Sequence, residues 1–281
     1  MSDVLPKGGV MVRILLITLL TVITFLLRRR KKMVNGMLEA SRGALKEEIR
    51  MDIIANNMAN SNGIGFKKDR VSFQQYLNQS ENSEPQQLTK EGIQRDPYLM
   101  SIDVDMSEGD MQTTGNTLDL AITGDGFFKI NTSDGVRYTR KGNFNLDSKG
   151  NLVTQDGDYV MGKGGKITIT GKKIVIGDKG TISVDDTIVD QLDIVKFKDN
   201  KDLVKEERSL FKNSNSTEDP EVAIGDDTTV KQGFVELSNV NVAEEMVNMI
   251  HSMRAFESYQ KAMKSIDQMN NEAINQVGSL R

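Results

Sequence analysis

Apolar residues recur at helical spacing near both ends of this chain, and the long stretch between the ends lacks that spacing. The N-terminal stripe consists of Met37, Ala44, Met51 and Met58 at seven-residue intervals, with Ile54 on a second position. The C-terminal stripe consists of Met249, Phe256, Met263 and Val277 on one heptad position, with Ile266 on a second. A seven-residue repeat places apolar side chains in a narrow seam along a helix. Because isolated helices are marginal in water, each seam needs a partner.

Local signals set the ends of these helices. The first helix is predicted to end near Ser61, where Asn60, Asn62, Gly63 and Gly65 tolerate a left-handed backbone. The second is predicted to begin after Asn241, which can cap it, and to run for almost 40 residues. The sequence thus predicts an N-terminal helix and turn over residues 33–66 and a C-terminal helix over residues 237–281.

Short alternating runs separated by Gly, Asn and Asp fill the middle of the chain. Residues 98–236 are predicted to form a β-rich domain with hairpin turns, such as the one at Gly124 and Gly126. Residues 67–97 read as a polar linker, and residues 199–220 as an exposed charged loop within the β region. The predicted fold is mixed: a discontinuous α-helical terminal domain, with coiled-coil-like N- and C-terminal helices, surrounds a β-rich central domain.

Residues 1–32 form a segment of a different character. The apolar run from Ile14 to Leu27 has 14 residues and is followed by five basic residues. A membrane span needs roughly 17 to 25 residues, so this run is short for one. The Arg-Arg-Arg-Lys-Lys sequence is what a purine-rich ribosome-binding site would encode, which favours Met33 as the true start of translation. The alternative is a hydrophobic anchor that holds the chain at a membrane.

Few residues are suited to catalysis or to ligand binding. The chain has no cysteine, which excludes disulfides and cysteine zinc sites. Its single histidine, His251, lies within the predicted C-terminal helix, so a catalytic triad would have to recruit it from the seam. Without residues 1–32 the chain has 29 basic and 39 acidic residues, a net charge of −10. We therefore expect no enzymatic activity, no cofactor, no metal site and no nucleic-acid partner.

Three stretches together resemble the basal-body rod and hook group of the flagellar axial proteins. The first is A-N-N-M-A-N-S-N-G-I-G-F-K at residues 55–67, which contains Asn56, Asn57, Asn60, Asn62, Gly65 and Phe66. The second is T-G-N-T-L-D-L-A-I-T-G-D-G-F-F at residues 114–128, with Gly124 and Gly126. The third is S-N-V-N-V-A-E-E-M-V-N-M-I at residues 238–250, with Asn239 and Asn241. One departure is Gly63, where the family usually has Thr or a similar residue.

The resemblance implies a structural subunit of the flagellar basal-body rod, of the proximal-rod type or, as the alternative, the distal-rod type. It implies export through the flagellar type III apparatus and helical polymerisation into the drive shaft that crosses the periplasm. The implied partners are copies of the chain itself, other rod, hook and basal-body subunits, and the export apparatus. The rival hypothesis is a membrane-anchored extracytoplasmic β-domain binding protein, which would require the apolar run of residues 14–27 in the mature chain.

Overall fold

The computed structural model describes residues 35–75, 98–197, 200, 203–214, 221–223, 225 and 227–278. Within them the chain forms two compact units. The helical unit contains residues up to Asp52 and residues from Val247 onward, and the β-rich unit contains Ile53–Met246. The possible start at Met33 and the extension before it lie outside the described residues. Among the helices that are described, none combines the length and apolar character that a membrane crossing requires.

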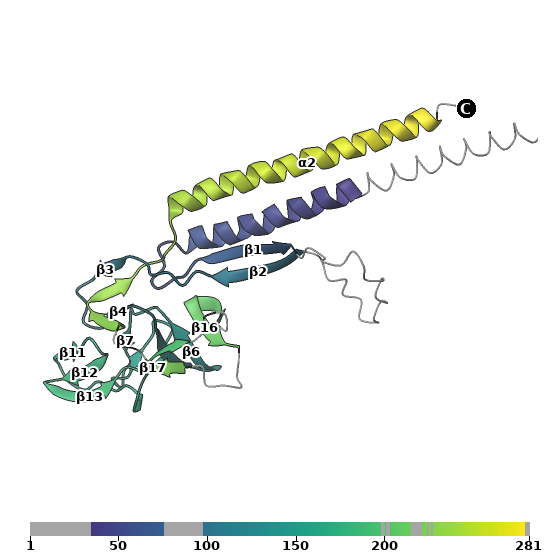
Figure 1. Cartoon of the computed structure of the whole chain (residues 1–281). Helices are drawn as coiled ribbons and strands as arrows, with labels where there is room; N and C mark the ends of the chain where they lie inside the picture. The colour runs from purple at the N-terminus through teal and green to yellow at the C-terminus, as the bar shows by residue number, and fades with distance from the viewer. Residues whose placement is uncertain are drawn as a thin grey trace, which may run out of the picture. The chain divides into compact units, whose positions relative to one another are not determined.

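The helical unit pairs two helices that run in opposite directions (Figure 1). Residues 35–59 are helical, and helix α2 spans Val242–Gly278. A Cβ built on Gly43 would lie 2.4 Å from the Tyr259 ring, and one built on Gly36 would lie 3.6 Å from Ile266. Moving seven residues back along the first helix therefore moves seven forward along α2. Small residues of the first helix thus face large residues of α2 in a fixed antiparallel register.

The predicted helix ends are confirmed. The first helix ends at residue 59 and is followed by a turn in which the Gly63 N–H donates to the Asn60 carbonyl oxygen at 2.9 Å. Helix α2 begins directly after Asn241, whose Oδ1 accepts hydrogen bonds from the N–H groups of Ala243 at 3.1 Å and Glu244 at 3.2 Å. These two bonds satisfy N–H groups that have no partner within the helix.

The β-rich unit is built from antiparallel strands (Figure 1). One sheet has the strand order β15-β16-β6-β5-β9-β8-β7, with β10 paired to β9 and β14 paired to β5 and β17. Three smaller sheets complete the body: β11-β12-β13, β18-β4 and β19-β3. Strands β1 and β2 form a separate two-stranded sheet. The strands are β1 Asp69–Gln75, β2 Tyr98–Val104, β3 Met111–Thr113, β4 Leu120–Thr123, β5 Phe127–Thr132, β6 Gly135–Thr139, β7 Asn145–Leu146, β8 Leu152–Val153, β9 Tyr159–Gly162, β10 Gly165–Lys166, β11 Ile174–Ile176, β12 Thr181–Val184, β13 Thr187–Gln191, β14 Ile194–Phe197, β15 Leu203–Lys205, β16 Leu210–Asn213, β17 Glu221–Ala223, β18 Thr229–Gln232 and β19 Phe234–Glu236.

Two apolar clusters lie on the two faces of β5, because successive side chains of a strand point to opposite faces. Phe128 belongs to the larger cluster, where its ring centroid lies 5.1 Å from that of Phe144. Phe127 belongs to the smaller cluster and packs edge-to-face on Phe197 and Phe211 at 5.9 and 5.5 Å. The aromatic residues are thereby divided between two thin cores.

Three sequence predictions within this unit were wrong. The turn at Gly124 and Gly126 joins β4 to β5, which lie in different sheets and pair with other strands, so it is not a hairpin turn. Part of the expected polar linker, Asp69–Gln75, is strand β1, which pairs along its whole length with β2. The expected charged loop contains β15, a 3-10 turn at Glu207–Ser209 and β16, and β16 pairs with β6. Leu203 and Phe211 are buried there among charged neighbours. One buried side chain per short strand was too weak a signal to outweigh the charge around it.

Candidate functional site

Side-chain amides hold the asparagine-rich turn in place within the β-rich unit. Asn57 Nδ2 donates to the Asp69 carbonyl oxygen at 2.9 Å, and the Asp69 N–H donates back to Asn57 Oδ1 at 2.9 Å. The buried amide thus replaces one backbone unit of a strand pair. Asn60 Nδ2 donates to the Asn56 carbonyl oxygen at 2.9 Å, which closes the last helical turn. Asn56 and Asn62 are themselves exposed.

Gly65 brings this turn close to two other segments. Its φ of +62° lies in the left-handed region, and its N–H donates to the Glu236 carbonyl oxygen at 2.7 Å. A Cβ at this position would lie 2.5 Å from backbone atoms of Arg140 and Lys141, closer than such atoms can approach. The next residue, Phe66, is buried, and the Lys205 ammonium lies 3.8 Å from its ring centroid. Residue 65 must therefore be glycine both because of its positive φ and because its neighbours leave no room for a Cβ.

A buried ionic cluster lies immediately after this turn. Lys67 is 1% exposed, and its Nζ donates to Glu236 Oε1 and to the Ser107 carbonyl oxygen, both at 2.6 Å. Glu236 is fully buried, and its Oε2 lies 3.3 Å from Nη1 of Arg140. The other oxygen of Glu236 also accepts the Gly109 N–H at 2.9 Å. One carboxylate therefore joins four segments that are far apart in the sequence.

The electrostatics of this ionic cluster are unbalanced, because two cations share one anion. Burial lowers the pKa of Lys67, and the charge of Glu236 opposes that shift only in part. Arg140 compensates by donating to backbone: its Nη2 lies 2.7 Å from the Gly124 carbonyl oxygen, and its Nη1 lies 3.2 Å from that of Ile122. Glu236 is thus the group whose charge both buried cations depend on.

Asn239 ties the start of the C-terminal segment to the same region. Its Oδ1 accepts the Lys68 N–H at 2.8 Å, and its Nδ2 donates to the Asp105 carbonyl oxygen at 2.8 Å. Burial alone would raise the pKa of Asp105, but hydrogen bonds from Ser107 and the charges of Arg70 and Lys68 outweigh it and hold that pKa below its usual value. Motif residues from both ends of the chain therefore meet in one network.

Three residues of this network were missed by the sequence analysis: Lys67, Arg140 and Glu236. Lys67 is the last residue of the first motif and Glu236 stands two residues before the third, yet charged residues are almost never fully buried unless they are paired. Lys67 and Glu236 are 169 residues apart. No local pattern could therefore have predicted their burial. Of the predicted motif glycines, Gly124 has a φ of +88° and accepts the Arg140 hydrogen bond, while Gly126 has a φ of +154°.

The predicted seam residues differ in their exposure. Ala44 and Ile54 are buried, whereas Met37 is 46% exposed. The half-buried residues are Met51, Met58, Met249, Phe256, Met263 and Ile266. The side chain of Val277 lies outside the described residues. Glu47, which interrupts the seam pattern, is nevertheless buried and bonds Arg50 at 3.0 Å.

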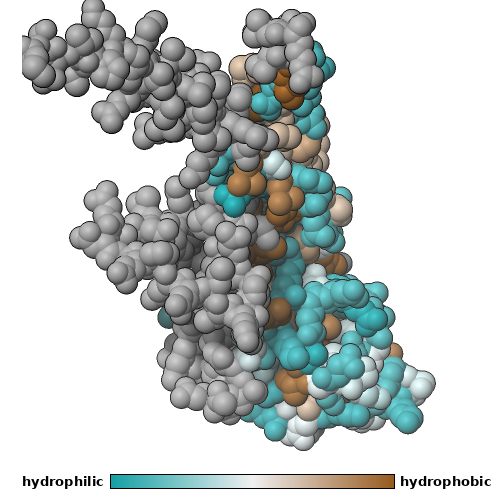
Figure 2. All heavy atoms as spheres, turned by 90° about the vertical axis from the view of Figure 1, so that its right-hand side faces the viewer, coloured by the Kyte–Doolittle hydropathy of each residue, from teal (hydrophilic) through white to brown (hydrophobic). Residues whose placement is uncertain are grey.

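Large apolar side chains also remain exposed on both helices. On α2 they include Val247, Ile250 and Met253, and on the first helix they include Leu38 and Leu45. Figure 2 shows brown apolar atoms recurring along the helices, while the visible surface of the β-rich unit is mainly hydrophilic. Exposed apolar side chains that recur along one surface are typical of an interaction site.

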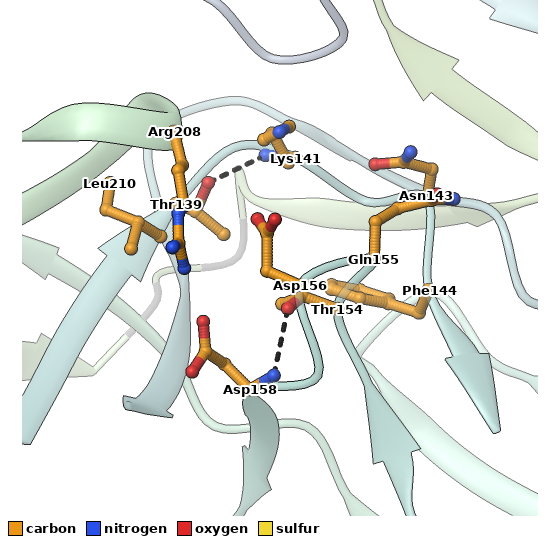
Figure 3. A pocket seen from close by; sticks show the side chains of 10 residues that line it. All are labelled: Thr139, Lys141, Asn143, Phe144, Thr154, Gln155, Asp156, Asp158, Arg208 and Leu210. Carbon is orange, nitrogen blue, oxygen red and sulfur yellow. Dashed lines mark hydrogen bonds between the residues drawn. The ribbon is translucent and has the colours of Figure 1, made fainter. Parts of the chain in front are cut away.

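A small pocket in the β-rich unit contains Asp156, Asp158 and Arg208 (Figure 3). Its hydroxyl groups bond to the backbone: Thr154 Oγ1 accepts the Asp158 N–H, and Thr139 Oγ1 accepts the Lys141 N–H, each at 3.1 Å. Among the described residues, no three His, Cys, Asp or Glu side chains gather where they could hold a metal ion. His251 is exposed on α2. Both threonine hydroxyls in the pocket therefore stabilise the backbone of their own loops.

A β-rich unit held together by a buried ionic cluster, together with long terminal helices that expose apolar side chains, is the architecture of a structural subunit. Three family models match successive parts of the chain, in the order of the three motifs described above. "Flagella basal body rod protein" matches residues 37–67, "Flagellar hook protein FlgE/F/G D1 domain" residues 121–184, and "Flagellar basal body rod FlgEFG protein C-terminal" residues 231–276.

Curated relatives match over most of their length. The flagellar basal-body rod protein FlgG of Bacillus subtilis is 35% identical, over 86% of this chain and 99% of the relative. FlgG of Buchnera aphidicola subsp. Acyrthosiphon pisum is 33% identical, over 84% and 97%. FlgF of Caulobacter vibrioides is 33% identical, over 82% and 92%. The chain therefore belongs to the flagellar basal-body rod protein family, whose members are structural components of the flagellar basal body.

Proposed function

We propose that this chain polymerises helically into the flagellar rod, the drive shaft that transmits torque across the periplasm. Its partners are further copies of itself and other rod, hook and basal-body subunits, and it reaches the rod through the flagellar type III export apparatus. It carries out no catalysis. Its terminal helices form the inner tube of the rod, with coiled-coil-like packing of their seams.

The exposed apolar side chains of the terminal helices carry this proposal. Helix α2 has 37 residues, and Val247, Ile250 and Met253 on it are each about half exposed. A single copy leaves this surface in water, and burial of apolar surface is the main driving force for association. Subunits that cover these faces for one another would gain that free energy along the whole polymer.

The test is Phe256→Asp, a substitution within the seam of α2. A carboxylate placed in a packed helical tube costs several kcal/mol, and the loss of the aromatic ring adds about 3–5 kcal/mol. Because Phe256 belongs to the helical unit, we expect the β-rich unit to stay folded and the variant to be exported. Incorporation into the rod, and with it motility, should be lost.

Gln260→Asp supplies the matched control, since Gln260 is an exposed residue of the same helix. Both variants are expressed in a strain that lacks the native copy, and export, thermal unfolding and motility are measured. Normal motility of an exported Phe256→Asp variant would show that the seam is not an assembly surface.

A further inference from the structure

The four asparagines of the turn motif differ in how their side chains are held. Asn57 is buried and exchanges two hydrogen bonds with the backbone of Asp69, both at 2.9 Å. Asn60 Nδ2 donates to the Asn56 carbonyl oxygen at 2.9 Å and to Asn56 Oδ1 at 3.4 Å. Asn62 is exposed, and its side chain bonds to no other residue within the described part of the chain. Of the four carboxamides, that of Asn62 is therefore the most able to rotate.

Asn62 is also the one of the four that is followed by glycine. A side chain on the following residue crowds the approach to its backbone nitrogen, and Gly63 has none. Asn62 lies in the turn after the first helix, where only the bond from the Gly63 N–H to the Asn60 carbonyl oxygen, at 2.9 Å, has to open before the nitrogen can react. Such a bond at the end of a helix opens more easily than one in its interior. The other Asn-Gly pair of the chain, Asn35 and Gly36, lies within the helix.

We propose that Asn62 is a spontaneous deamidation site of this chain, and that the turn controls the rate of the reaction. The Gly63 nitrogen attacks the side-chain carbonyl carbon of Asn62, and the new C–N bond closes a succinimide ring. The C–N bond to the side-chain nitrogen breaks, and that nitrogen leaves as ammonia with the proton of the Gly63 N–H. Water then opens the ring at either carbonyl carbon, which leaves aspartate or isoaspartate at residue 62. The reaction needs no reagent other than water.

The product is unfavourable at this position. A carboxylate at residue 62 stands just beyond the C-terminal end of the first helix, where the helix dipole disfavours negative charge. Isoaspartate also lengthens the main chain by one methylene close to Gly65, whose N–H must reach the Glu236 carbonyl oxygen and whose Cα is packed against the backbone of Arg140. Unfolded copies, in which the Gly63 N–H is not held, deamidate fastest. A copy that has reacted then folds into a less stable β-rich unit.

The test compares the four asparagines within one peptide. Cleavage after lysine and arginine releases residues 51–67, which contain all four. The full chain is incubated at mildly alkaline pH with and without urea, and this peptide is sequenced by tandem mass spectrometry at intervals. We expect the mass gain from replacement of NH2 by OH to appear at Asn62 before the other three, and to appear sooner in urea.

Gly63→Ala is the matched variant. Its Cβ would lie 3.1 Å from the Asn60 carbonyl oxygen, a contact that a small shift relieves, and it should slow the reaction at Asn62 even in urea, where the fold has no influence. No mass gain at Asn62 in urea, an earlier gain at another of the four, or an unchanged rate in Gly63→Ala would overturn the assignment of the site. Equal rates with and without urea would overturn the role of the turn.

The cost of the product is measured with Asn62→Asp, which carries the same charge as deamidated Asn62. This variant should unfold at a lower urea concentration than the wild type, and an equal midpoint would contradict the expected effect of the carboxylate on the helix end. The proposed function does not depend on these outcomes, because it is tested separately by the motility of the Phe256→Asp variant.

Discussion

Replacement of Glu236 by glutamine tests whether one carboxylate holds the β-rich unit together. Glu236→Gln keeps the shape of the side chain and an oxygen that can still accept the Gly109 N–H. Among the described residues, it removes the only negative charge within 3.5 Å of Lys67 and Arg140, which are 1% and 3% exposed. Removal of one partner from a buried ion pair costs about 3–5 kcal/mol, because the remaining charge stays buried and uncompensated.

That loss is a large fraction of the roughly 5–15 kcal/mol that stabilises a typical domain. For a unit of this size we expect the midpoint of thermal unfolding to fall by roughly 6–20 °C. Urea and thermal unfolding followed by circular dichroism on the full chain would measure it. The control is Asp125→Asn, which breaks an exposed bridge to Lys196 and should cost no more than about 1 kcal/mol. A Glu236→Gln variant that unfolds within about 1–2 °C of the wild type would refute the reasoning, because such a shift corresponds to less than about 1 kcal/mol.

Two further predictions concern the same unit. Gly65→Ala should destabilise it far more than Gly157→Ala in urea unfolding. Gly157 also has a positive φ, +89°, but nothing lies within 4 Å of its Cβ position. Equal losses of stability would mean that the close approach at Gly65 is relieved at little cost. The low folded-state pKa of Asp105 stabilises the fold fully above its unfolded pKa of about 3.9, and this contribution is lost as the pH falls through the lower folded value. The stability difference between the wild type and Asp105→Asn should therefore shrink as the pH is lowered from 6 towards about 2, and a difference independent of pH would contradict the assignment.

The features predicted correctly depend on signals that are close together in the sequence. The end of the first helix follows from asparagine and glycine residues within a few positions of one another, and the start of α2 follows from Asn241 alone. A hairpin turn likewise needs only its own residues, as at Gly135, whose φ is +103°. In each case the backbone conformation is set by steric and hydrogen-bonding preferences that act locally.

The features that were missed depend on distant partners. The carboxylate of Glu236 is buried because Lys67 and Arg140 meet it, and neither is near it in the sequence. Strand β16 forms because Phe211 reaches a cluster built around Phe127, although the residues beside it resemble a solvated loop. The seams of the two helices were predicted, but only the structure shows that Gly43 of the first helix lies against the Tyr259 ring of α2.

The antiparallel register of the helical pair has a consequence for folding. Since Gly43 is level with Tyr259 and Gly36 with Ile266, Ile250 is level with Asp52. Gly43 and Tyr259 are 216 residues apart in the sequence, so neither helix can meet its partner until almost the whole chain is present. Because isolated helices are marginal in water, each terminal helix depends on the far end of the chain for its stability.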